Sequence, residues 1–331
     1  MKRTNKLKKI ALSLALTGSF VAMGSAHAET GKVVFAYQTG WAYLPIHVMN
    51  ELKLVEKHAK ALGVNVTTEY KALGTPGMIN DAMNANQVDF GTVGIPSLVT
   101  LNDKTKGQYK AVGAIVDLPM YLNTTASYKS ICEFKEGDKI ALPTVKVSVQ
   151  AVTLQMAAKQ QCGDPYKLDK FTISSTHPDG FTSLMSGNVI GHFTSPPFQY
   201  SELKDKKVKT LVSSYDVLGG KSSFISLVGK QTFADANPKV QKAVYEALVE
   251  AQEWINKSKI DAAKLYFKVE QPKNQTMDEV LGQLTDKEIE FTAVPHGIEK
   301  YSKFMNEIGT AKSNATWKDL TFPAVHNKKG S

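Results

Sequence analysis

Two stretches of this chain share one layout, and that layout constrains the fold more than any other feature of the sequence. Residues 73–97 read LGTPGMINDAMNANQVDFGTVGIPS, and residues 176–198 read THPDGFTSLMSGNVIGHFTSPPF. Each contains a loop with a threonine, a short helix pattern, a turn with an asparagine, a small strand and a second loop with proline. In the first stretch, Thr75 suits a helix N-cap and Pro76 suits the first helical position. Loops that open onto helix starts in this way predict a cradle for a small molecule or an anion; ordinary βαβ turns without a ligand are the alternative.

Strand and helix patterns alternate along almost the whole chain, which favours α/β layers over mainly parallel sheets. The predicted strands are residues 33–37, 64–70, 89–93, 109–116, 139–142, 170–174, 190–193, 211–214 and 223–229. The predicted helices include residues 45–62, 149–161, 181–186 and 238–258. The segment GWAYLP before the first helix is expected to be a loop, and residues 314–331 carry few packing signals.

The sequence has 331 residues, and a chain of this length suits two domains of ordinary size better than one core. We expect a first lobe of residues 29–117 plus 222–331 and a second lobe of residues 118–221, because strand 223–229 reads as a return to the first lobe. The chain would cross between the lobes near Asp117–Tyr121 and Val217–Ser222. Two lobes with loops facing across a cleft form a venus-flytrap, in which closure about a hinge encloses a solute.

The N-terminus predicts export. A basic start is followed by an apolar run from Ile10 to about Met23 and then by Ala26-His27-Ala28, a small-x-small cleavage pattern. Residues 1–28 are therefore predicted to be a signal peptide that is cleaved after Ala28; a retained N-terminal anchor is the alternative. The apolar run is shorter than a comfortable membrane span.

The charge of the exported chain argues against nucleic acid and limits how an anion could be bound. The five basic residues of the leader reduce the formal net charge from +9 for the full chain to +4 when they are removed, which is too small an excess to indicate a nucleic-acid partner. Arg3 is the only arginine in the sequence. A bidentate guanidinium clamp on a carboxylate, sulfonate or phosphate is therefore impossible after cleavage, so an anion would have to be held by helix N-termini, hydroxyls, amides or lysine.

Two cysteines, Cys132 and Cys162, remain after cleavage. In an exported protein a disulfide is the natural interpretation, and two buried free thiols are the alternative. Cys132 precedes the predicted strand 139–142, and Cys162 ends the predicted helix 149–161. The start of a strand and the end of the next helix lie at the same pole of a βα unit, so the pair can bridge there, away from the edge where ligands bind.

The chain resembles periplasmic solute-binding proteins of ABC importers, in the nitrate/sulfonate/taurine-type family related to thiamine-pyrimidine-synthesis-like proteins. The resemblance covers roughly residues 33–251 and rests on four stretches in the family's order: GWAYLPIHVMNELKLVEKHAKALGVNV, residues 74–97, KIALPTVKVSVQAVTLQMAAK and residues 177–198. It implies a type II periplasmic-binding fold, with two α/β lobes around a hinge and a ligand cleft. It also implies a periplasmic location, no catalysis, no cofactor or metal, and delivery of a small solute to an ABC permease in the inner membrane. We expect a monomer without a nucleic-acid partner.

The resemblance also implies site residues. Trp41 and Tyr43 stand in the first loop, where the family commonly places ligand-facing side chains; aromatic rings there can stack on a flat solute or hold a cation, and a wedge between the lobes is the alternative. Thr75 and Gly77 match the family's small-residue loop, whose N–H groups can bind an oxygen. The other predicted ligand-binding residues are Gly94, Pro96, Ser97, Ser148, Gln150, His177, Asp179, Thr194 and Ser195. Two positions depart from the family: Gln150 replaces a frequent histidine, and Lys146 replaces a usual glycine. We expect Lys146 to point outward.

The solute and the final role stay open at this point. The lack of arginine weakens the prediction that the solute is a sulfonate or nitrate. Aromatic residues in the cleft would instead suit an aromatic or heterocyclic solute such as a pyrimidine precursor. An enzyme is one rival, because His177 and Asp179 are close in sequence, but there is no GxSxG, HExxH or phosphate loop, and HPD is typical of a turn. A pyrimidine-synthesis-like enzyme would need a cysteine-rich cluster for iron that this chain lacks. A periplasmic receptor for a membrane sensor is the other rival, and the sequence does not distinguish it from an importer component.

Overall fold

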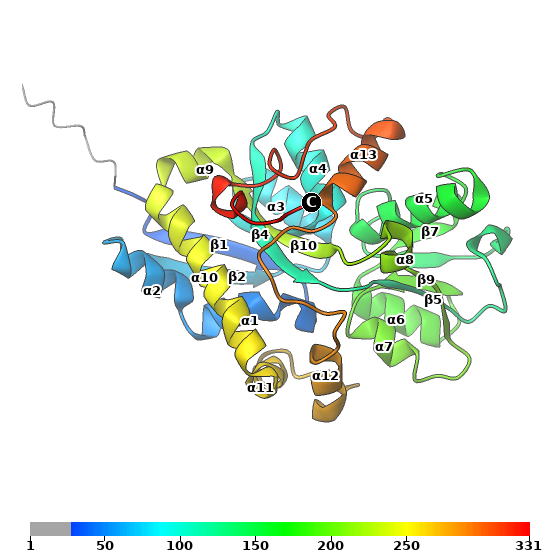
Figure 1. Ribbon diagram of the computed structural model, residues 1–331. Coiled ribbons are helices and arrows are strands. Elements are labelled where there is room, and N and C mark those ends of the chain that lie inside the picture. Colours follow the sequence, from blue (N-terminus) through cyan, green and yellow to red (C-terminus); the bar gives the residue numbers. More distant parts are fainter. Residues whose placement is uncertain (1–27) are drawn as a thin grey trace, which may run out of the picture.

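The computed structural model describes residues 28–331, which form two α/β lobes side by side (Figure 1). The predicted signal peptide lies almost entirely outside the described residues. Lobe I contains the sheet β2-β1-β3-β10-β4, and lobe II contains the sheet β7-β6-β8-β5-β9. The strands of lobe I are β1 (Lys32–Tyr37), β2 (Thr67–Ala72), β3 (Phe90–Gly94), β4 (Tyr109–Asp117) and β10 (Ser223–Lys230). Those of lobe II are β5 (Tyr121–Thr124), β6 (Ile140–Leu142), β7 (Thr172–Ser174), β8 (Gly191–Thr194) and β9 (Lys209–Ser213). The two-lobe α/β fold predicted from the sequence is confirmed.

Each sheet contains one strand that runs against the others. Strand β10 is antiparallel to both β3 and β4, and β5 is antiparallel to both β8 and β9. The remaining neighbours β1–β2, β1–β3, β6–β7 and β6–β8 are parallel. Strand β10 is the predicted return of the chain to the first lobe, and it occupies an interior position of that sheet.

Helices cover both sheets. Those of lobe I are α1 (Leu44–Glu51), α2 (Leu54–Ala61), α3 (Pro76–Asn84), α4 (Ile95–Lys104), α9 (Gln231–Ala236), α10 (Pro238–Lys257), α11 (Lys259–Glu270), α12 (Met277–Leu284) and α13 (Ile298–Glu307). Those of lobe II are α5 (Val149–Cys162), α6 (His177–Met185), α7 (Phe198–Glu202) and α8 (Ser214–Leu218). Short 3₁₀ helices cover Trp41–Tyr43, Ile131–Glu133, Asp169–Phe171 and Pro323–Val325. Among the described residues, none of these helices has the length and apolar character needed to cross a membrane.

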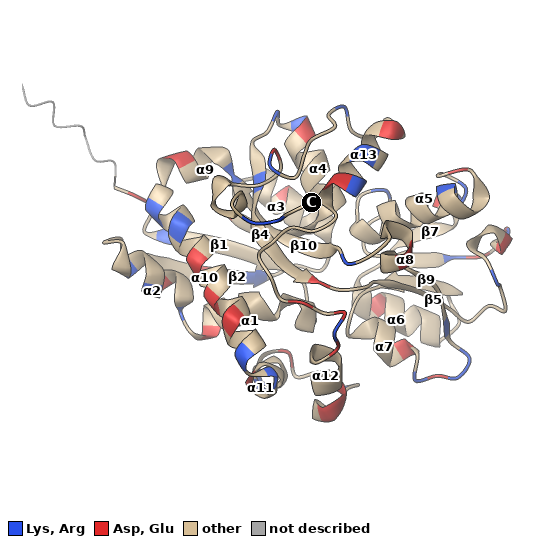
Figure 2. Cartoon of the chain, viewed as in Figure 1, with Lys and Arg blue, Asp and Glu red and all other residues tan. Residues whose placement is uncertain are grey.

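Acidic and basic residues both occur along α10, as Figure 2 shows. The Glu250 carboxylate on this helix lies 2.6 Å from Lys57 Nζ and 2.7 Å from His58 Nε2, both on α2. Such mixed-sign contacts dock two amphipathic helices whose apolar faces cover the sheet of lobe I.

The predicted helix 45–62 is wrong in one respect, because it is two helices. Lys53 adopts a left-handed conformation with φ 50° and separates α1 from α2. The expected loop GWAYLP is also wrong, since Trp41–Tyr43 form a 3₁₀ helix that leads directly into α1. Pro45 lies in the first turn of α1, where its missing N–H costs no hydrogen bond.

The C-terminal tail packs firmly, contrary to the expectation of few packing contacts. Leu320, Phe322 and Val325 are buried, and Thr321 forms a parallel bridge with Ala111 on β4. The backbone of the tail thus satisfies hydrogen-bonding groups at the edge of the sheet of lobe I. The sequence of the tail carries no periodic pattern that would predict this pairing, because the partner strand lies about 200 residues earlier.

The predicted disulfide between Cys132 and Cys162 is confirmed, with a Cα–Cα distance of 5.7 Å. Cys132 lies in the 3₁₀ helix before β6, and Cys162 is the last residue of α5. The bond therefore joins the start of a strand to the end of the following helix, as the βα arrangement predicts.

Candidate ligand site between the lobes

In each lobe, the loops that face the other lobe lead into helices whose first residue is preceded by a capping side chain. Thr75 Oγ1 accepts a hydrogen bond from the Met78 N–H at the start of α3, at 3.3 Å. In lobe II, Ser148 caps α5, and Thr176 caps α6 in the same way that Thr75 caps α3. The shared layout of residues 73–97 and 176–198 is therefore a shared geometry. The predicted helix 181–186 begins earlier than expected, because α6 already begins at His177 and includes the HPD residues that were expected to form a turn.

The tips of these loops touch directly. A Cβ atom added to Gly94 would lie only 2.8 Å from Val149 Cβ, so glycine is what allows the two lobes to meet there. Ser97 Oγ donates a hydrogen bond across the lobes to the Val147 carbonyl oxygen at 3.2 Å. A Cβ on Gly77 would make ordinary contact with Thr144, 3.6 Å away. The two lobes are thus in direct contact at this part of the cleft.

Trp41 and Tyr43 are both buried, and they contact lobe I. Trp41 Nε1 donates to Gln283 Oε1 on α12 at 2.7 Å, and its ring is tilted against Phe291. Tyr43 packs edge-on against Phe224, and its hydroxyl has no hydrogen-bond partner among the described residues. A buried hydroxyl without a partner is unusual.

His177, Thr194 and Ser195 form one buried group in lobe II. His177 Nδ1 lies 2.7 Å from Thr194 Oγ1, and Nε2 lies 3.4 Å from Ser195 Oγ. The imidazole ring stacks on Phe198 with a centroid distance of 5.8 Å. Burial, together with the neighbouring His192, lowers the pKa of His177 to about 3. The imidazole is consequently neutral at physiological pH and can donate one hydrogen bond and accept another.

The remaining predicted residues are divided between the cleft and the surface. Gln150 is buried, and its Nε2 atom has no partner within the described part of the chain. Pro96 is buried in the first turn of α4. Asp179 is exposed, and its carboxylate accepts from Thr176 Oγ1 at 2.6 Å, so it serves the start of α6. Lys146 is exposed, as expected, and its φ of 65° is a conformation that favours the glycine usual in the family.

An open cavity of about 300 Å³ lies between the lobes, and none of the predicted ligand-binding residues is among those that line it. Lobe I contributes Gly40, Tyr266 and Glu270 to its wall, together with the segment that follows α11. Lobe II contributes Pro178, Phe181, Pro197 and Phe198, among others. The wall combines aromatic rings and prolines with polar side chains, and a volume of this size accepts a small organic molecule.

Gly40 brings the two lobes together at one side of this cavity. Its φ is 117°, a backbone conformation that residues other than glycine rarely adopt, and a Cβ there would lie 3.1 Å from Pro197 Cδ. The first loop of lobe I and the loop after β8 in lobe II therefore share a contact that needs this glycine.

Glu270 is the acidic residue of the cavity wall, and sequence reasoning missed it. Its side chain is only 12% exposed, and Oε1 lies 2.9 Å from His47 Nε2 and accepts a hydrogen bond from the Gly40 N–H at 3.2 Å. Burial raises the pKa of Tyr266, and the negative charge of Glu270 raises it further. The same two causes, in the same order, raise the pKa of Tyr43 and of Tyr37. Glu270 thus places a carboxylate, in contact with the His47 ring, beside this region of the cleft.

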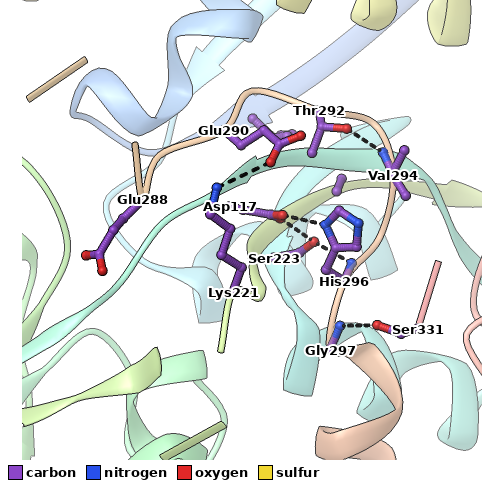
Figure 3. A network of polar contacts seen from close by, with 12 residues as sticks. Asp117, Lys221, Ser223, Glu288, Glu290, Thr292, Val294, His296, Gly297 and Ser331 are labelled. Carbon is purple, nitrogen blue, oxygen red and sulfur yellow. Dashed lines mark hydrogen bonds and ion pairs between the residues drawn. The ribbon is translucent and has the colours of Figure 1, made fainter. Parts of the chain in front are cut away.

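The chain crosses between the lobes beside a second polar cluster, which Figure 3 shows around Asp117, Ser223 and His296. Asp117 ends β4 and Ser223 begins β10, so the two residues mark the two crossings on the side of lobe I. Ser223 Oγ donates to Asp117 Oδ1 at 2.8 Å, and His296 Nδ1 lies 2.5 Å from Asp117 Oδ2. Burial raises the pKa of Asp117, while the His296 hydrogen bond opposes that rise; the same hydrogen bond raises the pKa of His296. Ser223 Oγ donates to Asp117 and accepts a hydrogen bond from the His296 backbone N–H, but it makes no hydrogen bond with the His296 imidazole. We call this cluster the hinge clasp, and it lacks the order of a catalytic triad.

Further contacts hold the two lobes together away from the cavity. Lys204 of lobe II lies 2.7 Å from Glu279 on α12, and Thr153 on α5 lies 2.8 Å from the Tyr301 hydroxyl on α13. The described structure is therefore one in which the lobes touch along both sides of the cleft.

The chain shares its architecture with solved binding proteins. The alkanesulfonate-binding protein SsuA from Xanthomonas axonopodis pv. citri, bound to MOPS, aligns with a TM-score of 0.70 and 14% identity over 89% of this chain and 99% of that chain. The periplasmic nitrate-binding protein NrtA from Synechocystis PCC 6803 aligns with a TM-score of 0.69 and 14% identity over 90% and 84%. The periplasmic aliphatic sulphonate-binding protein SsuA from Escherichia coli gives a TM-score of 0.63 and 15% identity over 89% and 92%. No protein-family model and no curated protein matches the sequence.

This likeness defines the class of fold. The chain has the fold of periplasmic binding proteins, and sulfonate- and nitrate-binding proteins are among the structures that share it. The fold implied by the sequence resemblance is therefore confirmed.

Proposed function

We propose that this protein is the extracytoplasmic solute-binding component of an ABC importer. In this proposal a first lobe of residues 29–117 plus 222–331 and a second lobe of residues 118–221 close on a small solute and present it to a membrane permease. The observation that carries the proposal is the cavity of about 300 Å³ whose wall is built by both lobes. A solute that contacts both walls stabilises the closed arrangement, which is how binding is reported to a partner.

The site supports binding without chemistry. Buried hydroxyls, an amide and a neutral imidazole are supplied by Tyr43, Gln150, His177, Thr194 and Ser195, which lie outside the cavity wall, and the wall itself carries the carboxylate of Glu270. Their arrangement contains no nucleophile held by a base that is itself oriented by a carboxylate. Such groups can orient a solute by hydrogen bonds, and the aromatic wall can stack on a flat solute. Aromatic and heterocyclic solutes are therefore favoured over small inorganic anions.

The test is a ligand screen on mature protein that begins at Glu29. Sulfonates, nitrate, pyrimidines and aromatic carboxylates are each added in large excess while the melting temperature is measured. A ligand that binds only the folded state raises the melting temperature by several degrees when its concentration is about 100 times its Kd. Recovered ligand is then analysed by mass spectrometry. Unchanged ligand with a raised melting temperature supports the proposal; conversion of the ligand into product would contradict it.

Export is tested separately by expressing the full chain in a bacterium and fractionating the cells. We expect the protein in the periplasmic fraction, with Glu29 as its first residue by N-terminal sequencing. A product that retains residues 1–28 and sediments with the membrane would instead indicate an anchored form.

A further inference from the structure

The cavity between the lobes carries a charge that the proposed function does not assign. Among the residues of its wall, the acidic one is Glu270 and the basic one is Lys273. Glu270 is mostly buried, whereas Lys273 is exposed. Solvent screens an exposed charge far more than a buried one, so Glu270 dominates the potential inside the cavity.

Glu270 has binding capacity that the protein leaves unused. Both of its contacts, with His47 Nε2 and with the Gly40 N–H, use Oε1. Among residues 28–331, no hydrogen bond or ion pair is formed by Oε2. A carboxylate has roughly four acceptor positions, so the second oxygen can accept a donor from a ligand without breaking a contact.

The position of Glu270 in its helix makes an added positive charge favourable. It is the last residue of the 12-residue helix α11, where the helix dipole places its negative end. A carboxylate there is repelled by the unpaired carbonyl groups of the last turn. The nearest lysine on the same helix, Lys268, is paired with Glu51 and is exposed. A cation beside Oε2 would offset this repulsion.

The rest of the wall suits the apolar part of an organic cation. Tyr266 lies one turn before Glu270 on α11, and Phe181 and Phe198 face the same cavity from lobe II. Phe198 is fixed by stacking on the buried His177 ring, and Phe181 packs on Phe198 at a centroid distance of 6.4 Å. Aromatic faces attract ammonium groups and also bury flat or aliphatic surface.

We propose that the cavity binds an organic cation, a primary amine or quaternary ammonium compound with an aromatic or apolar group, whose positive charge lies at Glu270 Oε2. The inference rests on the proposed solute-binding function and names the class of solute for the same cleft. The aromatic or apolar group of the solute lies against Tyr266, Phe181 and Phe198, so that the bound molecule contacts both lobes. The lack of arginine in the exported chain agrees with a solute that is not an anion.

The experiment compares four small benzene derivatives of different charge on the mature protein at neutral pH. Benzylammonium and benzyltrimethylammonium are the cationic probes, benzyl alcohol is the neutral counterpart and benzenesulfonate is the anionic one. We expect each cation to bind at least about tenfold more tightly than benzyl alcohol, measured by isothermal titration calorimetry and by the melting temperature. Benzenesulfonate is expected to bind more weakly than benzyl alcohol. If neither cation binds more tightly than benzyl alcohol, the inference is overturned.

The variant Glu270→Gln tests the assigned residue. Glutamine keeps the size of the side chain and an acceptor for the Gly40 N–H, so the fold should persist. We expect about tenfold or more loss of affinity for the cations and little change for benzyl alcohol. The matched control is Glu250→Gln, which removes a carboxylate that also contacts a histidine, His58, but lies on α10 outside the cavity wall. An equal loss in both variants, or none in Glu270→Gln, would overturn the assignment.

Two outcomes separate this inference from the function on which it rests. If sulfonates or nitrate raise the melting temperature and Glu270→Gln binds them as well as the parent protein does, the cation class is wrong and the solute-binding function stands. If no molecule of either panel changes the melting temperature, both proposals are contradicted.

Discussion

At the scale of single residues, His177 is a buried polar group of lobe II that carries no charge at physiological pH. Its imidazole is buried, stacked on Phe198 and hydrogen bonded to Thr194 Oγ1. A charged imidazole in this place would be removed from water without a carboxylate partner, so burial favours the neutral ring. The pKa of about 3 follows from that cost.

This pKa predicts acid sensitivity. The unfolded chain binds a proton on His177 near pH 6.5, whereas the folded protein binds it only near pH 3, so stability falls as the pH drops between those values. From about pH 6.5 to 4.5 the loss from this residue is about 2 to 3 kcal/mol. Urea unfolding of the parent protein and of His177→Gln at both pH values measures it. The parent should lose more stability than the variant; parallel losses would contradict the assignment.

Gly94 is the residue whose substitution tests closure. Its φ of −67° and ψ of 158° suit alanine, so the backbone of lobe I tolerates Gly94→Ala, but the added methyl group would press on Val149 of lobe II. Overpacking of this kind costs about 1 to 3 kcal/mol, which should weaken solute binding by roughly 5- to 150-fold and increase the radius of gyration in X-ray scattering. Gly77→Ala is the matched control, because its methyl group would meet Thr144 at ordinary contact distance. If Gly94→Ala binds the solute as tightly as the parent protein and has the same radius of gyration, Val149 moves aside and the prediction is wrong.

The candidate site was only partly predictable at this scale. Thr75, Thr176 and the glycines between the lobes stand in loop motifs that the sequence displays. Glu270 could not be found, because no motif surrounds it and its contact with Gly40 joins residues 230 positions apart. An isolated carboxylate at a helix end is normally a solvated surface group, and only the tertiary contacts distinguish this one.

At the scale of elements, strands and helices that their own sequence determines were predicted correctly, whereas those that depend on contacts with distant parts of the chain were not. Strands β1, β3 and β10 are short apolar runs bounded by turn residues, which identifies buried strands. The break between α1 and α2 was missed, because NELKLVEKH reads as one amphipathic helix and Lys53 gives no breaker signal. The packing of the C-terminal tail was also missed, because it comes from pairing with β4 and not from a pattern in the sequence of the tail.

The disulfide is the element-scale feature with the clearest energetic consequence. It closes a loop with a sequence separation of 30 residues within lobe II. Loop-closure entropy for that size predicts that the double variant Cys132→Ser/Cys162→Ser loses about 3 to 4 kcal/mol of stability. Urea unfolding with and without reductant checks this: reductant should destabilise the parent protein and leave the double variant unchanged. A parent protein that is indifferent to reductant would contradict the predicted contribution.

At the scale of the whole molecule, the two crossings between the lobes are held by the hinge clasp of Asp117, Ser223 and His296. Loop residues 290–296 reinforce it, since the Asp117 N–H donates to the Glu290 carbonyl and the Ser223 N–H donates to the His296 carbonyl. Both crossing strands are therefore tied to one loop of lobe I. If the lobes close as proposed, we expect the chain to bend beyond these ties, on the side of lobe II.

The clasp predicts a pH effect opposite to that of His177. Asp117 raises the pKa of His296 above its ordinary value of 6.5, so the folded protein holds this proton more tightly than the unfolded chain does. The resulting stability is present below about pH 6.5 and is lost as the pH rises through the raised pKa. Urea unfolding at about pH 6 and pH 8 should show this loss in the parent protein and not in His296→Gln. The control is His326→Gln, whose ring contacts Thr321 and Trp317 and no carboxylate; a parent protein without the loss would refute the clasp.

The interior position of β10 has a consequence for biosynthesis. Strands β3 and β4 are separated by β10, which is made only after all five strands of the other sheet. Lobe II is thus a continuous segment that can begin to fold while the chain is still emerging, whereas the sheet of lobe I waits for a strand made about 100 residues later. Until then, the facing edges of β3 and β4 stay unpaired, and a chaperone that protects them would act on the earlier half of the nascent polypeptide.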